Sequence, residues 1–412
     1  MNKVKEGYKM TELGEIPENW EVAKLGGISE ITMGQSPIGS SYNSIGEGIA
    51  LLNGPTEFTS KYPIAKQWTI KPTKLCSNKD ILFCVRGSST GRMNIADDKY
   101  CIGRGLASIR GKEKYSQTDF IYQTMIFNID SILSFCEGST FPNISGDNLK
   151  NLIIAMPSLK EQQKIFSILL SVDEKIENTD KLIEKTKELK KGLMQRILTK
   201  GIGHDKFKDT EIGRIPEAWE VRRLGTLFTI NNKSINPYEH NALFLHYSIP
   251  AFDETGNPVL QNGEEIRSNK FVIEKDSILV SKLNPRKKRV WKVNYICGKI
   301  QICSTEFINY NAISKEKIYI DFYFQYFFSD IFQNELLLRE KGTTGSRKRV
   351  SPSETKDIYV VLPSYKEQVE ISNFLSTLDL KLKQYKTKKE KLQELKKGLM
   401  QNLLTGKIRV KV

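Results

Sequence analysis

Residues 157–199 read PSLKEQQKIFSILLSVDEKIENTDKLIEKTKELKKGLMQRILT, and residues 363–405 read PSYKEQVEISNFLSTLDLKLKQYKTKKEKLQELKKGLMQNLLT. The two segments are identical at 21 of 43 positions, including an unbroken ELKKGLMQ in each. Agreement at this level indicates that part of the chain is duplicated, and an internal duplication constrains the fold more strongly than any single motif.

Each copy predicts a long helix, because apolar residues return every three or four positions while Lys and Glu fill the remaining faces. The apolar stripe of the first copy contains Ile165, Leu169, Val172, Ile176, Ile183, Leu189, Leu193 and Ile197. That of the second contains Ile371, Leu375, Leu378, Leu382, Leu392, Leu395, Leu399 and Leu403. Each copy opens with Pro-Ser and has Glu three residues after the serine, which predicts a capping box. Gly201 and Gly406 follow the last apolar turns, where helices commonly stop.

A narrow apolar stripe on a long helix needs a partner to cover it. The other copy in the same chain is the simplest partner, so we expect an antiparallel pair of helices with pseudo-two-fold symmetry. A helix of about forty residues spans about 60 Å, enough to hold two domains apart. The alternative is a solvated helix that only joins domains.

A second repeat precedes each variable part of the chain. Residues 8–26 (YKMTELGEIPENWEVAKLG) and 207–225 (FKDTEIGRIPEAWEVRRLG) are identical at 12 of 19 positions. The pattern predicts a turn leading into a strand, with Trp20 and Trp219 as core anchors rather than ligand-stacking residues. Between the repeats lie two unlike segments, residues 27–156 and 226–362.

Both variable segments predict mixed helix and strand. Residues 80–111 have the pattern of short strands with Gly-rich turns, residues 120–135 of a helix, and residues 137–152 of a loop. The second segment repeats this order with strands at 276–280 and 290–302, a helix at 322–339 and a loop at 341–358. The predicted fold class is therefore α+β, with two α/β domains separated by two long antiparallel helices in a coiled coil. The predicted domains are residues 1–156, 157–200, 201–362 and 363–412.

The chain has a net charge of +15, which favours a polyanionic partner over an acidic protein or a membrane surface. Loop residues of the variable segments are the candidate DNA contacts, because Arg and Lys can pair with phosphates or guanine while Asn and Gln can read adenine. Gln35, Asn53 and Asn284 are candidate base readers. The predicted contacts are Gln35, Asn53, Arg86, Ser88, Ser89, Thr90, Arg92, Arg104, Ser139 and Thr140 in the first segment, and Lys282, Asn284, Arg286, Lys287, Lys288, Arg289, Ser346, Arg347, Lys348 and Arg349 in the second.

Signatures of chemistry are missing from the sequence. There is no phosphate-binding GxxxxGK[ST] loop and no [ND]PP[YF] motif of an amino-methyltransferase, since Asn236-Pro237-Tyr238 lacks the second proline. The six cysteines form no CxxC pair, and three scattered histidines do not predict a metal site. We expect reduced, mostly packed thiols and no catalytic residue, metal or cofactor in this chain. Without a long apolar run or a secretory signal, we also expect a cytoplasmic protein.

The duplicated [IL]PxxWEVxxLG motif, the two PSxKEQ…ELKKGLMQ helices and the terminal LLTGKIRV resemble the specificity subunit of type I restriction–modification systems. The resemblance covers essentially the whole chain. RGSSTGRMNIADDKYCIGRGLASI also resembles that family's target-recognition domains. The sequence SKLNPRKKRV at the matching place in the second segment departs from this pattern.

The resemblance implies a division of labour. Each target-recognition domain would read one half of a split sequence in double-stranded DNA, and the helix pair would set the gap. Two methyltransferase subunits carrying S-adenosylmethionine would methylate adenine, and restriction subunits using ATP and Mg²⁺ would cut. Two alternatives remain from the residues themselves: a stand-alone DNA-modifying enzyme, or a coiled-coil adaptor that binds only proteins.

Overall fold

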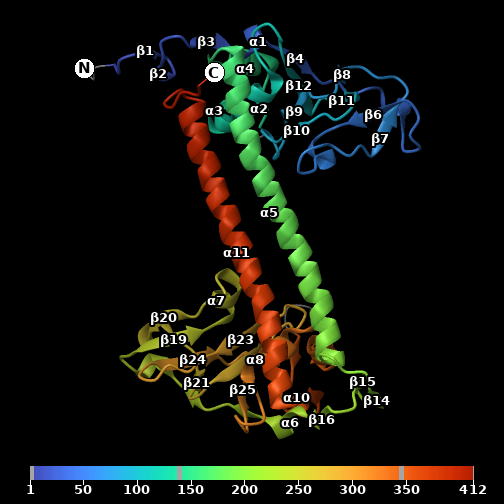
Figure 1. Ribbon diagram of the computed structural model, residues 1–412, viewed down its shortest axis with the longest axis vertical. Coiled ribbons are helices and arrows are strands. Elements are labelled where there is room, and N and C mark those ends of the chain that lie inside the picture. The colour runs from blue at the N-terminus through green and yellow to red at the C-terminus, as the bar shows by residue number, and fades with distance from the viewer. Residues whose placement is uncertain (1–3, 137–141, 343–347, 412) are drawn as a thin grey trace. The chain divides into compact units, whose positions relative to one another are not determined.

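The computed structural model describes residues 4–136, 142–342 and 348–411. Its contacts divide the chain into two compact units, which we call unit 1 (Met1–Asp180 with Thr387–Val412) and unit 2 (Lys181–Lys386). Each unit contains one variable segment and part of each long helix, so the division falls within the helices rather than at their ends. Both units mix sheets and helices, which confirms the predicted α+β class (Figure 1).

The two predicted helices are α5 (Leu159–Lys200) and α11 (Tyr365–Leu403). Their predicted starts are confirmed: the Glu161 N–H donates to Ser158 Oγ at 3.4 Å and the Glu367 N–H to Ser364 Oγ at 3.3 Å. The glutamate half of the predicted capping box differs, because both carboxylates accept hydrogen bonds from tryptophan instead. Trp20 Nε1 donates to Glu161 at 3.0 Å, and its counterpart in unit 2 donates to Glu367 at 2.8 Å.

The glycines after the helices are required by both conformation and space. Gly201 has φ +65° and Gly406 has φ +71°, a region that residues with a Cβ rarely adopt. A Cβ on Gly201 would lie 2.9 Å from the ring of Trp219, and one on Gly406 would lie 2.4 Å from Pro17. Each long helix therefore ends against the first-repeat motif of the unit that contains its C-terminal part.

Within unit 1, the segments of α5 and α11 are antiparallel. Lys396 pairs with Asp173 and Lys389 with Asp180, both at 2.7 Å, so the residue number rises along α5 as it falls along α11. Leu399 and Met400 of α11 join the core that holds Ile165 of α5.

Within unit 2, the same arrangement holds with the roles exchanged. Lys190 of α5 pairs with Asp379 of α11 at 2.5 Å, and Leu198 shares a core with Ile371. Lys190 and Asp379 are the sequence-repeat equivalents of Lys396 and Asp173. The predicted antiparallel pairing is thus confirmed inside each unit.

Unit 1 carries two sheets in its variable segment. A four-stranded antiparallel sheet has the order β10-β9-β12-β4, and a five-stranded sheet has the order β5-β7-β6-β11-β8, with β6 and β11 parallel. The strands are β4 (Ser29–Met33), β5 (Tyr42–Asn43), β6 (Ile49–Leu52), β7 (Gln67–Thr69), β8 (Leu75–Cys76), β9 (Ile81–Cys84), β10 (Met93–Ile95), β11 (Tyr100–Ile102) and β12 (Leu106–Gly111). The accompanying helices are α1 (Leu25–Ile28), α2 (Thr118–Phe127), α3 (Ile129–Ser134) and α4 (Gly146–Asn151).

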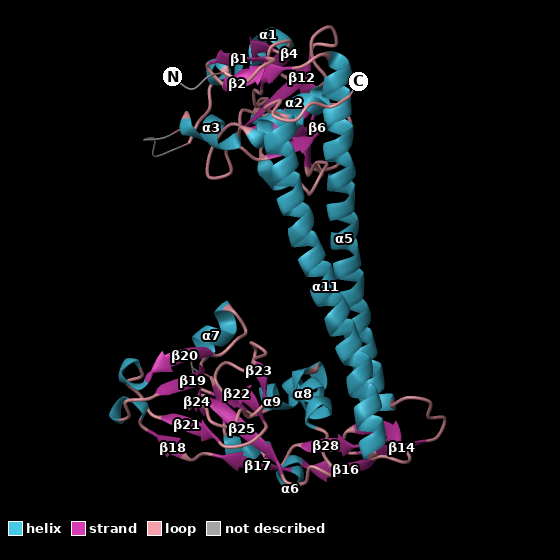
Figure 2. Cartoon of the chain, turned by 60° about the vertical axis from the view of Figure 1, so that its left-hand side comes forward, coloured by secondary structure: helices cyan, strands magenta, loops and turns pink. Residues whose placement is uncertain are grey.

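Unit 2 repeats the four-stranded sheet as β23-β22-β25-β17 and has a five-stranded sheet of order β18-β21-β24-β19-β20 (Figure 2). Its strands are β17 (Phe228–Asn231), β18 (Ser234–Ile235), β19 (Leu243–Tyr247), β20 (Val259–Asn262), β21 (Lys270–Ile273), β22 (Ser277–Ser281), β23 (Val290–Val293), β24 (Ile300–Ser304) and β25 (Phe307–Ala312). Its helices are α6 (Leu224–Leu227), α7 (Ile249–Glu254), α8 (Ile320–Phe328), α9 (Asp330–Leu338) and α10 (Pro352–Thr355).

The shared topology differs at one strand. In both units a parallel pair, β6 with β11 or β19 with β24, forms the centre of the five-stranded sheet. The first short strand of each five-stranded sheet, β5 or β18, lies on opposite sides of that parallel pair. In unit 1, β5 pairs with β7 on the β6 side, whereas in unit 2, β18 pairs with β21 on the β24 side, and β24 is the equivalent of β11. The variable segments are therefore two versions of one fold rather than unrelated domains.

Three predicted elements are interrupted in the structure, and each of the two predicted loops, at 137–152 and 341–358, contains a short helix, α4 or α10. The helices predicted at 120–135 and 322–339 are each two helices, α2 with α3 and α8 with α9. The strand predicted at 290–302 is also two strands, β23 and β24, separated by a turn in which Gly298 has φ +81°.

The first repeat forms a hairpin and a strand that joins the end of the variable segment. In unit 1, β1 (Tyr8–Thr11) pairs with β2 (Gly14–Pro17), and β3 (Glu21–Lys24) pairs with β13 (Ile153–Met156), which leads into α5. Unit 2 repeats this with β14 (Phe207–Thr210), β15 (Gly213–Pro216), β16 (Glu220–Arg223) and β28 (Tyr359–Leu362). Trp20 and Trp219 are both 0% exposed, which confirms that they are core anchors.

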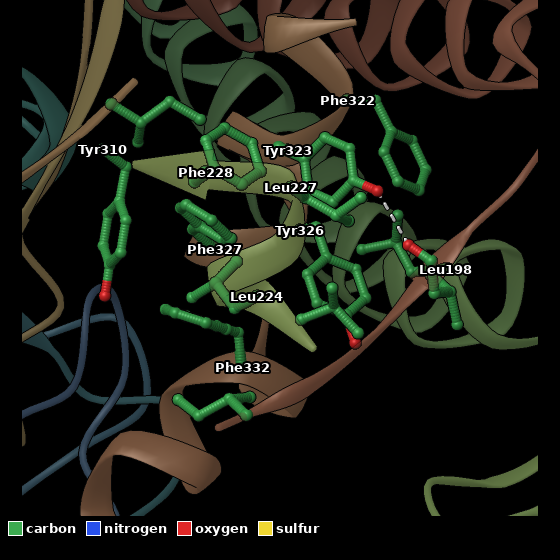
Figure 3. Close-up of a cluster of buried hydrophobic side chains, with 14 of the residues drawn as sticks. Leu198, Leu224, Leu227, Phe228, Tyr310, Phe322, Tyr323, Tyr326, Phe327 and Phe332 are labelled. Carbon is green, nitrogen blue, oxygen red and sulfur yellow. Dashed lines mark hydrogen bonds between the residues drawn. The ribbon is translucent and has the colours of Figure 1, made fainter. Parts of the chain in front are cut away.

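The core of unit 2 is rich in aromatic rings (Figure 3). Phe228 meets Tyr323 edge-on with ring centres 5.0 Å apart, and Phe327 stacks on Phe332 at 4.3 Å. Leu198 of α5 packs into the same cluster. Each such ring removes a large apolar surface from water, and the variable segment and the helix ends share one continuous core.

Candidate nucleic-acid interface

Four loops of unit 1 converge beyond the ends of its strands: residues 34–36, 53–54, 85–92 and 103–105. Backbone hydrogen bonds join them, with the Gly103 N–H donating to Leu52 O at 2.8 Å and the Val85 N–H to Gly105 O at 2.9 Å. Glycine is required at the contacts, because a Cβ on Gly105 would lie 2.6 Å from the Asn53 carbonyl oxygen. The loops therefore bring the predicted contacts Gln35, Asn53, Arg86 and Arg104 into one region.

The loop after β9 is braced against a second loop. The Gly87 N–H donates to Pro142 O at 3.1 Å, and Arg86 Nε donates to Asn143 Oδ1 at 2.9 Å. Gly87 has φ +84°, and its carbonyl oxygen accepts from Thr90 Oγ1 at 2.7 Å. Of the predicted contacts, Arg86, Ser88 and Arg92 are exposed, while Ser89 and Thr90 are half-buried.

Two amide side chains form a pair at this region. Asn53 Nδ2 donates to Gln67 Oε1 at 3.0 Å, and Gln67 is an exposed residue. The Arg104 N–H donates to Ser36 Oγ at 3.3 Å, so the backbone of this loop is fixed while its guanidinium stays exposed. Sequence reasoning missed Gln67, Ser36 and Asn143, because only the chain's fold places them beside the predicted residues.

Unit 2 builds the equivalent region with different residues. The Asn284 N–H donates to Lys348 O at 2.8 Å, and the Lys282 N–H donates to Glu306 O at 2.9 Å. These bonds correspond to those of Gly87 with Pro142 and of Val85 with Gly105. Asn284 also has the positive φ of Gly87, at +48°, so the two loops share a backbone path although their sequences differ.

Most basic side chains of the unit 2 loops are engaged within the unit. Arg289 is 6% exposed, and its guanidinium binds both Asp253 oxygens at 2.7 Å. The hydrogen bond from Arg289 lowers the pKa of Asp253, and the bond from Lys288 lowers the pKa of Asp330. Arg289 is therefore placed as a structural residue with little surface for DNA.

The remaining predicted cations of unit 2 lie on two loops. Arg286 and Lys348 both approach Glu340, at 3.5 and 3.0 Å, and Arg349 pairs with Glu306 at 2.9 Å. Lys287 is exposed, Lys282 is half-buried, and neither makes an ion pair among the described residues. Ser139, Thr140, Ser346 and Arg347 lie outside the described residues.

The described part of the chain holds no group of three or more His, Cys, Asp or Glu side chains placed to bind a metal ion. Cys76, Cys84, Cys101 and Cys303 are buried free thiols, as predicted. Burial raises the pKa of both Cys76 and Cys303 to about 12, so neither is a ready nucleophile. No helix within the described ranges is long and apolar enough to cross a membrane.

Two equivalent loop clusters of unlike chemistry, each on a copy of one scaffold, define a two-domain recognition protein. The family described as "Type I restriction modification DNA specificity domain" matches residues 17–188 and 216–396, so the chain belongs to the family of type I restriction–modification specificity subunits.

Similar proteins from Methanocaldococcus jannaschii carry related names. The type I restriction enzyme MjaVIII specificity subunit is 27% identical over 98% of this chain and 97% of its own length. The MjaX specificity subunit is 39% identical over 47% of this chain, and that match spans only 45% of the MjaX protein.

Two solved structures share the fold. The S subunit of a type I system from M. genitalium superposes with a TM-score of 0.57 at 20% identity, covering 94% of this chain and 96% of its own. A chain from a study of type I complex assembly gives 0.60 at 15% identity, covering 95% and 99%.

Proposed function

We propose that this chain gives a type I restriction–modification complex its DNA sequence specificity, with each unit reading one half of a bipartite site. The observation that carries the proposal is the equivalence of the loops at 85–92 and 282–289. They occupy the same place on two copies of one fold yet present different side chains, as two readers of different half-sites would.

The helix segments give the scaffold for spacing and assembly. Antiparallel pairing fixed by the ion pairs of Asp173 and Asp379 keeps the register of α5 against α11 within each unit. We propose that two methyltransferase subunits dock on these helices and that restriction subunits join them, as in the family. S-adenosylmethionine, ATP and Mg²⁺ would then belong to those partners, this chain would supply no catalytic group, and the complex would act in the cytoplasm.

Adenine methylation in cells that express this chain with its methyltransferase subunit tests the proposal. We expect one bipartite motif. Replacing Arg86 and Arg92 together by Ala should relax or change one half only, while replacing Lys282 and Lys287 should affect the other half. A single uninterrupted motif, or changes in both halves from one pair of substitutions, would contradict the assignment. Methyl transfer by the purified chain alone would favour a stand-alone enzyme instead.

A further inference from the structure

Unit 1 contains a cavity of about 810 Å³ that shares no residue with the four converging loops. We call it the acidic groove. One wall is the face of α5 from Phe166 to Asp180, a second is α2, and the third comes from residues 60–62, 78–79 and 95–97, with Lys396 of α11.

The groove has an apolar floor. Half-buried side chains of both helices line it: Tyr122 and Ile126 from α2, and Phe166, Leu170 and Ile176 from α5. Partly exposed apolar surface of this kind gains free energy when a ligand covers it.

Its charge is opposite to that of the chain. Six carboxylates line the groove against three lysines: Asp97, Asp119, Asp173, Glu174, Glu177 and Asp180 against Lys61, Lys79 and Lys396. Two of the carboxylates are neutralised by the ion pairs between the long helices, Asp173 by Lys396 and Asp180 by Lys389, so Asp119 and Glu174 carry much of the acidic character. Burial raises the pKa of Asp119 against the lowering effect of Lys79 and Lys61. In a chain of net charge +15, this local acidic surplus repels a phosphate backbone.

A buried amide oxygen in the groove lacks a donor. Gln123 is 2% exposed and lines the cavity; its Nε2 donates to Asp173 Oδ2 at 3.0 Å, while its Oε1 has no hydrogen-bond partner among the described residues. In unit 2, the equivalent Gln325 also donates from its Nε2 to an aspartate, Asp379 Oδ2, at 3.2 Å. A buried acceptor without a donor is costly, so a rotation of the Gln123 side chain that brings this oxygen to an N–H of a ligand would be favoured.

We propose that the acidic groove binds a basic segment of a protein partner in which an arginine or lysine lies beside an apolar side chain. The carboxylates and the Gln123 oxygen accept hydrogen bonds, so the ligand must donate them and carry positive charge. The floor receives the aliphatic stem and its apolar neighbour. This inference goes beyond the proposed DNA reading and does not depend on it.

Three labelled peptides test the proposal with the full chain by fluorescence anisotropy. One alternates arginine with leucine, the second arginine with serine, and the third glutamate with leucine. The groove variant is Asp119→Asn with Glu174→Gln, which removes charge without changing shape. The matched control is Glu30→Gln with Glu113→Gln, which makes the same charge change at exposed positions of unit 1 away from the groove.

We expect the arginine–leucine peptide to bind the natural chain more tightly than either other peptide. Its Kd should rise about tenfold in the groove variant and stay unchanged in the control. Absence of binding, equal losses in both variants, or equal binding of the glutamate–leucine peptide would overturn the proposal. So would loss of duplex DNA binding by a correctly folded groove variant, because the groove would then belong to the DNA interface. Failure of the natural chain to bind DNA would contradict only the proposed function.

Discussion

At the scale of single residues, a tryptophan–glutamate pair ties the two sequence repeats together in each unit. Glu161 is 1% exposed. Its carboxylate accepts a hydrogen bond from Trp20 Nε1 at 3.0 Å and two from the Arg409 guanidinium at 2.7 and 3.0 Å. In unit 2, Glu367 accepts from Trp219, and His204 takes the place of Arg409, three residues after the equivalent glycine. This pairing explains why both copies keep WEV and KEQ, which periodicity alone could not show.

Replacing Glu161 by Gln should lower the stability of unit 1. The substitution leaves Arg409 beside a neutral amide, and losing a charge-assisted bond at a buried partner costs about 1–3 kcal/mol. A fall of several degrees in the unfolding midpoint of unit 1 by calorimetry would agree with this. Glu367→Gln is the matched variant and should cost less, because histidine carries a full charge only when protonated. Equal, negligible effects would show that the pairs do not join the repeats energetically.

The basic loop of unit 2 contains two kinds of cation that the sequence does not distinguish. Arg289 is buried on Asp253, whereas Lys287 is exposed. Arg289→Ala should therefore lower the unfolding midpoint of unit 2. Lys287→Ala should leave that midpoint unchanged, weaken binding of DNA that carries the unit 2 half-site, and reduce the salt dependence of the binding constant by about one ion. The reverse pattern in thermal unfolding and salt titrations would refute this assignment.

At the scale of elements, the helices could be predicted from sequence because their period is sustained over many turns. The breaks between α2 and α3 and between α8 and α9 were not predicted, because no Gly or Pro marks them; the N-cap residues Asn128 and Ser329 lie there instead. The sequence predicts the loop sites only as regions, because positive charge marks the segments. Which cations pair within the unit depends on acidic residues far along the chain, such as Asp253, which binds Arg289, and Glu306, which binds Arg349.

Asn284 illustrates this limit. It was predicted as a base reader, and it also holds the left-handed backbone position that Gly87 holds in unit 1. We expect Asn284→Gly to keep the loop and the unfolding midpoint of unit 2, and Asn284→Val to cost about 1–2 kcal/mol because a branched side chain opposes positive φ. Hydrogen exchange of the loop amides and thermal unfolding measure this. Tolerance of valine would exclude a backbone role, and a changed half-site in the glycine variant would reveal a reading role as well.

At the scale of the whole molecule, the net charge and the internal duplication are visible in the sequence itself, and a DNA-binding protein with two recognition domains is expected from them. The family assignment agrees with that expectation. The acidic groove could not, because its carboxylates come from separate segments that only the folded unit brings together. The proposed function requires the paired helices to act as a spacer between two readers.

Inserting one heptad in each helix tests the spacer role, with insertions between Asp180 and Lys190 in α5 and between Asp379 and Lys389 in α11. These positions keep the ion pairs of each unit and the apolar stripe intact. The added length is about 10 Å, which corresponds to about three base pairs of duplex. Methylation mapping should then show both half-sites unchanged and the gap between them longer by up to that amount. An unchanged gap with full methylation would contradict a spacer role for the paired helices.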